Sequence, residues 1–287
     1  MPVTITASKT SGSYASGLPG FANPPVNEVV LSVQFDPLPS LQIHHFGLLW
    51  NEFRARFPKV ESHPPIDRAI ETFQREPAVQ RQITFELVNP FMAPRVWFVS
   101  PAGNELLQIQ RDRFIVNWRR VKPDDKYPRY PHVRSMFERE FQIFAAFVAQ
   151  QKLGDIVTNQ VEVTYINQIQ PCAVWDRHAQ VGRVLNVMAP EFKDEKLPTP
   201  ELFRFSAQYV VGPTDAPIGR LHLDFQPGFR GSDRKPIFAM NLTVRGKPMG
   251  DGLAGALKFM DVGRENIVRG FHALTTPAMH KEWGFHG

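Results

Sequence analysis

The chain has 287 residues, a length that accommodates one large domain or two small ones. Its composition, 43% hydrophobic and 21% charged, is ordinary for a globular protein and excludes a disordered, collagen-like or coiled-coil chain. No apolar run approaches the roughly 20 residues of a membrane-spanning helix, so we expect no membrane association. The single cysteine, Cys172, excludes an intramolecular disulfide framework and any multi-cysteine metal site.

The net charge is +5, and it is spread over both halves of the chain. Such a charge permits an anionic partner but is also typical of a protein that merely stays in solution. Residues 1–22 are rich in Ser, Gly and Thr and hold no apolar signal core, so we expect a flexible N-terminal tail. With one cysteine and no export signal, we expect a cytoplasmic protein.

Hydrophobic periodicity places the first regular elements after this tail. Val29, Leu31 and Val33 alternate with other side chains, which indicates a half-buried strand. Farther on, Phe137 and Phe141 fall one helical turn apart, which indicates a buried helix stripe. The pattern predicts, in order, a strand over 27–35, a helix over 43–57, strands over 96–99, 105–110 and 114–119, and a long helix over 132–153.

The order of elements then begins again. Strands are predicted over 160–169, 203–211, 220–227 and 237–245, followed by a long helix over 252–274. A short final helix starts with Thr276 as N-cap and Pro277 as its first residue. Both halves therefore run from a strand through three further strands to a long helix.

A weak internal repeat accompanies this order. At a constant offset of 134 residues, four identities fall in one short stretch: Glu28, Val29, Gln34 and Pro37 match Glu162, Val163, Gln168 and Pro171. We therefore predict an α+β fold, an antiparallel sheet packed by long helices, built as two similar β-α-β-β-β-α halves over 23–155 and 156–287 in one compact unit. The layout is analogous to TATA-binding-protein-like and helix-grip architectures, which assigns no activity.

Short motifs along nearly the whole chain resemble those of a sporadically distributed bacterial family of uncharacterised proteins of about this length. The segments that carry the resemblance are Asn23-Pro24-Pro25-Val26, Gln110-Arg111-Asp112-Arg113-Phe114 with Asn117-Trp118-Arg119, Tyr127-Pro128-Arg129-Tyr130, Tyr165 with Asn167, and Thr275-Thr276-Pro277 with Trp283-Gly284. The resemblance implies a full-length relationship, and it implies no reaction, cofactor or catalytic residue.

Polar and basic side chains alternate with apolar ones along several predicted strands, so they share one face of the sheet. If the strands align, that face is net basic, as the lining of a nucleic-acid groove is. The residues singled out for anion or nucleic-acid binding are Arg111, Arg113, Asn117, Arg119, Arg204, Arg220, His222 and Arg245. The alternative is a plain solvated face, which antiparallel sheets commonly have.

The densest basic cluster runs from Arg111 through Arg120 and Lys122 to Lys126, with Phe114 and Trp118 between. Arginines that neutralise phosphates beside an aromatic ring that stacks on a base would suit single-stranded nucleic acid. Phe114 and Trp118 lie on one face of their strand, however, and the simpler interpretation places both rings in the core.

Other motifs indicate little chemistry. The G-x-G-x-x-G of residues 250–255 is followed by no second parallel strand, so we interpret it as a turn and not as a dinucleotide site. His222 and Asp224 share a strand face and are interpreted as a surface pair. No spacing of histidines and cysteines fits zinc. We therefore expect no cofactor and no metal, and we assign no catalytic residue.

The sequence favours a non-enzymatic binding protein whose polar, net-basic sheet face engages an anionic partner, with nucleic acid as the most concrete version. One alternative is a small-ligand-binding or hydrolytic protein with a pocket between the sheet and a long helix. A second alternative is a protein–protein adaptor, acting on a protein partner or as a homodimer through exposed aromatic and Pro-rich segments.

Overall fold

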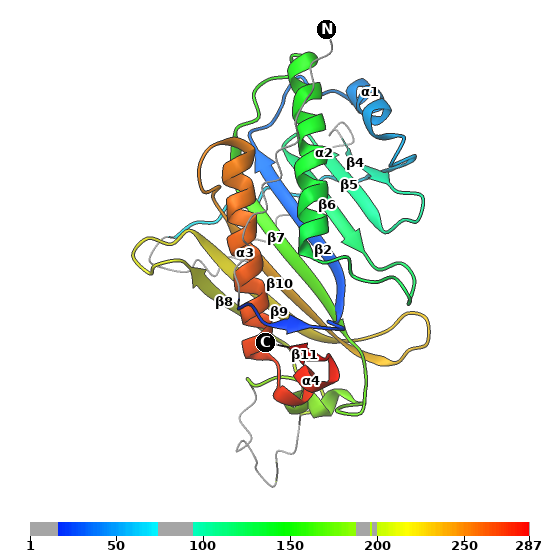
Figure 1. Cartoon of the computed structure of the whole chain (residues 1–287), viewed down its shortest axis with the longest axis vertical. Coiled ribbons are helices and arrows are strands. Elements are labelled where there is room, and N and C mark those ends of the chain that lie inside the picture. The colour runs from blue at the N-terminus through cyan, green and yellow to red at the C-terminus, as the bar shows by residue number, and fades with distance from the viewer. Residues whose placement is uncertain (1–16, 74–93, 188–195, 197–199, 287) are drawn as a thin grey trace.

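One antiparallel sheet organises the molecule. The computed structural model describes residues 17–73, 94–187, 196 and 200–286, and these contain a sheet of nine strands (Figure 1). The strands are β2 (Val26–Phe35), β3 (Lys59–His63), β4 (Arg95–Val99), β5 (Glu105–Gln110), β6 (Arg113–Arg119), β7 (Thr158–Ile169), β8 (Phe205–Val211), β9 (Gly219–Phe229) and β10 (Pro236–Gly246). Their order across the sheet is β3-β4-β5-β6-β2-β7-β10-β9-β8.

Two long helices, α2 (Tyr130–Gln150) and α3 (Gly252–Leu274), lie side by side across one face of the sheet (Figure 1). Three shorter helices complete the described helices: α1 (Ile43–Phe53), the 3₁₀ helix η1 (His178–Arg183) and α4 (Pro277–Glu282). The predicted α+β class, an antiparallel sheet packed by long helices, is confirmed. Among the described residues, no helix combines the length and apolarity needed to cross a membrane.

The core lies between the sheet and these two helices. In β2, Val29, Leu31 and Val33 are fully buried, as their alternation predicts. Phe114 of β6 stacks on Phe144 of α2 with ring centroids 5.2 Å apart. Phe114 and Trp118 are therefore core side chains, and neither ring is available to stack on a base.

Apart from the edge strand β3, which has no counterpart, the strand order is symmetric about the central pair β2 and β7. Moving outward, β6 corresponds to β10, β5 to β9 and β4 to β8, and each half ends in a long helix. Val30 pairs directly with Thr164, the residue 134 positions later. On either side of this pair, Val29 faces Tyr165 and Leu31 faces Val163, so a two-fold rotation about the pair superimposes each strand on the other. The offset found in the sequence thus coincides with a local two-fold arrangement of the fold. A common ancestry of the halves stays a prediction.

The two described ends of the chain are joined in a small two-stranded sheet, which we call the clasp. It pairs β1 (Gly20–Phe21) with β11 (Phe285–His286). Phe21 is buried and meets Phe271 of α3 edge-on, with ring centroids 5.6 Å apart. The predicted flexible tail over 1–22 is therefore wrong at Gly20–Phe21, because pairing and burial anchor them. Residues 1–16 of that tail lie outside the described residues.

Candidate functional site

The predicted binding residues mostly gather on the sheet face opposite α2 and α3. Those that lie there are Arg113, Asn117 and Arg119 of β6, Arg220 and His222 of β9, and Arg245 of β10. Arg111 instead lies in the turn between β5 and β6, where it donates hydrogen bonds to the Leu38 and Pro39 carbonyls at 3.4 and 2.8 Å. Arg204 is exposed and precedes β8.

A segment of the same chain crosses this face. Residues 64–73, which we call the strap, follow β3 and run over successive strands, and inward side chains bind the strap backbone. The bonds are Ile66 N to Gln110 Oε1 (2.9 Å), Ala69 N to Gln34 Oε1 (3.0 Å), Glu71 N to Gln160 Oε1 (3.1 Å) and Arg113 Nη2 to the Asp67 carbonyl (2.9 Å). The polar face in this region is therefore an internal interface, since its side chains satisfy backbone groups of the strap.

Glu71 fixes the end of the strap on the basic side chains. Its carboxylate accepts hydrogen bonds from Arg220 and, at 2.8 Å, from His222 Nε2. Arg245 lies 3.7 Å from it and binds Glu162 at 2.6 Å. Burial raises the pKa of Glu71, but the hydrogen bonds and charges of His222 and Arg220 outweigh burial and lower it overall.

Asn117, in the other half of this face, is also paired: it donates to Glu28 Oε1 at 2.6 Å and accepts from Gln108 at 2.8 Å. Burial raises the pKa of Glu28, and the Asn117 hydrogen bond and the Arg119 charge offset only part of that rise. The basic side chains on the described part of this face are therefore held in a network of hydrogen bonds and ion pairs within the chain, although the buried Nε of Arg113 has no partner there. His222 pairs with Glu71, and not with the Asp224 that the sequence favoured.

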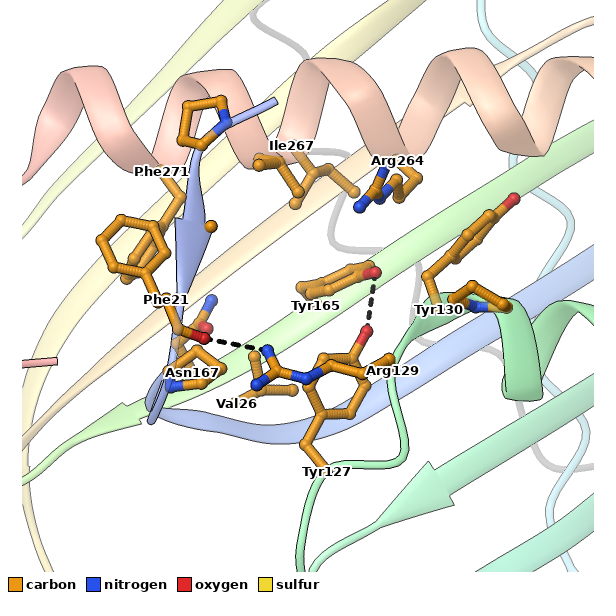
Figure 2. A pocket seen from close by; sticks show the side chains of 15 residues that line it. Phe21, Val26, Tyr127, Arg129, Tyr130, Tyr165, Asn167, Arg264, Ile267 and Phe271 are labelled. Carbon is orange, nitrogen blue, oxygen red and sulfur yellow. Dashed lines mark hydrogen bonds between the residues drawn. The ribbon is translucent and has the colours of Figure 1, made fainter. Parts of the chain in front are cut away.

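A cavity of about 130 Å³ lies on the opposite side of the sheet, where α3, β7, the turn before α2 and clasp strand β1 meet (Figure 2). Its apolar wall comprises Pro19, Phe21, Pro24, Val26, Ile267, Val268 and Phe271. Its polar wall comprises Tyr127, Arg129, Tyr130, Tyr165, Asn167 and Arg264. This is the place between sheet and long helix where the small-ligand alternative expected a pocket.

Three tyrosines line the polar part of this cavity. The Tyr127 and Tyr165 oxygens are 3.0 Å apart, and the Tyr130 hydroxyl donates to Asp261 at 2.8 Å (Figure 2 shows the three rings). Burial raises the pKa of Tyr127 and of Tyr130 well above the ordinary value, and it raises that of Tyr165. All three groups therefore remain protonated at neutral pH, and because Tyr130 donates to Asp261 and one hydroxyl of the Tyr127–Tyr165 pair donates to the other, one hydroxyl proton of that pair is left for an occupant.

Arg264 of α3 adds a cation to the cavity. Its guanidinium lies 5.6 Å from the centre of the Tyr130 ring and faces the Tyr165 hydroxyl (Figure 2). Its Nε is buried, and no hydrogen-bond partner for it exists among the described residues. Because an unsatisfied buried donor costs about 1–3 kcal/mol, the cavity favours an occupant that brings an acceptor.

Arg129 stands at the mouth of the cavity in a strained conformation. Its φ of 75° is in the left-handed region, uncommon for a non-glycine residue and enriched at ligand sites. It donates to the carbonyls of Phe21 and Ala22 at 3.0 and 2.9 Å (Figure 2 shows the first of these bonds). Two flanking prolines, Pro128 and Pro131, restrict the turn around it.

An open cleft of about 1360 Å³ adjoins the cavity, and Pro24, Tyr127 and Arg129 line both. Three residues of the basic cluster found in the sequence line the cleft: Arg120, Lys122 and Lys126. These three cations form no ion pair within 4 Å across the described part of the chain, and the buried Nε of Arg120 has no hydrogen-bond partner there.

The cleft is also lined by the carboxylates Asp124, Asp125 and Glu282, of which Asp125 is engaged by the backbone. Asp125 accepts hydrogen bonds from the backbone amides of Val121 and Lys122 at 2.9 and 2.8 Å, so it caps the loop. These backbone hydrogen bonds, with the charges of the basic loop, lower the pKa of Asp125. The acid therefore shapes the loop that presents the cations instead of neutralising one of them by direct contact.

Sequence reasoning did not select the cavity, although a signal for it existed. The segments that carry the family resemblance converge here: Pro24 and Val26 from the first, Tyr127 through Tyr130 from the third, and Tyr165 with Asn167 from the fourth. Periodicity could not bring them together, because they come from three different elements.

No protein-family model matches the sequence, and no curated protein matches it. The family resemblance therefore stays a prediction, and the interpretation of the site depends on its geometry.

Proposed function

We propose that the protein binds an anionic partner in the open cleft, with nucleic acid as the most concrete version of that partner. The observation that supports this most directly is the group of unpaired cations, Arg120, Lys122 and Lys126, on one concave surface. Cations without an internal carboxylate gain most from phosphate contacts, because counterions of the nucleic acid are released when such contacts form. Arg129 at the mouth of the cavity also lines the cleft, but its guanidinium already donates to the carbonyls of Phe21 and Ala22, so the proposal does not depend on it.

The cleft supports this role better than the sheet face. On that face Arg113, Arg220 and Arg245 already bind carbonyl or carboxylate oxygens of the chain. A partner would have to displace the strap and Glu71 to reach them, and the freed groups would lose buried hydrogen bonds. In the cleft the carboxylates that line the surface, Asp124, Asp125 and Glu282, form no ion pair within 4 Å with Arg120, Lys122 or Lys126 among the described residues.

Fluorescence anisotropy with labelled single-stranded RNA, single-stranded DNA and duplex DNA, at about 50 and 200 mM salt, tests the proposal. We expect binding that weakens steeply with salt. In the triple variant Arg120→Gln/Lys122→Gln/Lys126→Gln, the salt slope should fall by about 2, because each single-strand phosphate contact contributes about 0.7. The matched control is Arg54→Gln/Lys247→Gln/Lys258→Gln, which removes the same charge from exposed positions outside the cleft.

Two results would contradict the proposal. Binding to none of the probes at the lower salt would remove the anionic partner altogether. Equal loss of affinity in the triple variant and in the control would show that the net charge of +5, and not the cleft, attracts the probe.

A further inference from the structure

The cavity indicates what the anionic ligand carries besides its charge. We infer that the cavity holds a pyrimidine base and that the adjoining cleft holds the phosphates of the same ligand, a nucleotide unit either free or at the end of a single strand. This inference rests on the proposed function, since it assigns the second half of the same ligand.

The connection between the two spaces supports a single ligand. Tyr127 and Arg129 line both, so a molecule seated in the cavity leaves it past the Arg129 guanidinium and enters the basic cleft. The cavity offers an apolar wall to the faces of a ring, and its exit is cationic. A planar ring joined to phosphate has the same division of polarity.

The size of the cavity selects one ring. A dry cavity of about 150 Å³ holds benzene, and this one measures about 130 Å³. Its walls are rings of Phe21, Tyr165 and Phe271, among others, and aromatic walls favour offset or edge-on contact with another ring. This volume is on the scale of one six-membered ring, so a pyrimidine is the base nearest to it in size, whereas the fused rings of a purine exceed it.

The polar end of the cavity matches the edge of such a base. The unpartnered Nε of Arg264 requires an acceptor, and the hydrogen-bonded Tyr127–Tyr165 pair can share a further one. The edge of a pyrimidine carries carbonyl acceptors, O2 and O4 in uracil. A plain hydrocarbon ring would leave the Nε of Arg264 without an acceptor, so the cavity favours a base over an apolar side chain.

Isothermal titration of the full chain with uridine 5′-monophosphate, adenosine 5′-monophosphate and ribose 5-phosphate tests the inference for the free nucleotide. We expect the pyrimidine nucleotide to bind about tenfold or more tighter than either other compound, the order of one stacked base. Short oligouridylate, oligoadenylate and abasic strands repeat the comparison for a strand end.

Two variants locate the effect. Val268→Phe narrows the cavity from α3 and should abolish the preference for the pyrimidine while the affinity for ribose 5-phosphate is retained. Arg264→Gln removes the buried donor and should reduce the same preference, which gives a second test if Val268→Phe fails to fold. Val262→Phe, a partly buried position on α3 outside the cavity lining, is the matched control.

The outcomes separate this inference from the proposed function. Salt-dependent binding with equal affinity for the pyrimidine nucleotide and ribose 5-phosphate would overturn the inference and leave the anion site. Equal affinity for the purine and pyrimidine nucleotides would overturn the assignment by size. Preference for the pyrimidine that survives both cavity variants would place the base elsewhere, and absence of any binding would overturn inference and proposed function together.

Discussion

Glu71→Gln provides the sharpest test of how the strap is held on the sheet. The Glu71 carboxylate binds Arg220 and His222 of β9 and lies 3.7 Å from Arg245 of β10. Removing one partner of a buried ion pair costs about 3–5 kcal/mol. Here the Arg220 and His222 side chains are 19% and 28% exposed, and the Gln amide retains one acceptor oxygen. Water and this oxygen therefore replace part of the lost hydrogen bonding. We expect a loss of about 2 kcal/mol at neutral pH, which at a slope of about 3 kcal/mol/M lowers the urea midpoint by about 0.7 M.

The pH dependence of this loss has a definite sign. Because the pKa of Glu71 is lowered in the folded protein, its contribution to stability is present above the ordinary value of 4.5 and is lost as pH falls below it. The gap between wild type and Glu71→Gln should therefore close in acid. Urea titrations between about pH 3.5 and 7 measure this gap, and the difference cancels the other carboxylates common to both proteins.

A matched control distinguishes the strap from a general effect of charge. Glu265→Gln removes an exposed carboxylate that pairs with Arg269 one turn away on α3, and such pairs contribute about 0.5 kcal/mol or less. If Glu71→Gln were no more destabilising than this control, or if the gap were unchanged in acid, the account of Glu71 as an anchor of the strap would be wrong.

Three further predictions concern stability. Arg113→Ala should cost about 2 kcal/mol or more in urea titration, because the buried guanidinium holds Gln34 and the strap, and an unchanged midpoint would contradict this. Gly255→Ala should cost about 3 kcal/mol in the same assay and lower the helix signal in circular dichroism, since its Cβ would meet the Gly250 carbonyl. Burial and the neighbouring His272 lower the pKa of His280, so the free energy of unfolding should fall as pH drops below 6.5. His280→Asn should make the free energy of unfolding less dependent on pH in this range, and an equally steep pH dependence in the variant would refute the prediction.

The elements that the sequence predicted are those that bury an apolar stripe. The strand 105–110 and the helix 252–274 have the predicted bounds, because alternation and helical spacing are directly visible where one face is buried. β3 was missed since most of its side chains are exposed, so no apolar period marks it. α1 ends at Phe53 and not at residue 57, although Phe57 is buried, because a turn rather than the helix carries Phe57 into the core.

The candidate site shows a different limit of sequence reasoning. Polarity and alternation correctly placed Arg113, Arg220 and Arg245 on one face, but a cation at the surface of a sheet looks the same in sequence whether or not a carboxylate meets it. The deciding residue, Glu71, lies in a segment without periodicity and far from all three in sequence. Its position is fixed by glutamine side chains that bind the strap backbone. Such contacts produce no hydrophobic periodicity in the sequence of the strap.

The same argument explains why the cleft emerges only from the structure. Arg120, Lys122 and Lys126 belong to the cluster that the sequence singled out, yet their neighbours Arg111 and Arg113 bind carbonyls of the chain. Within one basic run, some cations stabilise the fold and others are left for a partner. The distinction is energetic: a guanidinium that already has acceptors gains little from a phosphate, whereas an unpaired one gains the full contact. Charge that remains unpaired after folding is therefore the better guide to a binding surface than charge counted along the sequence.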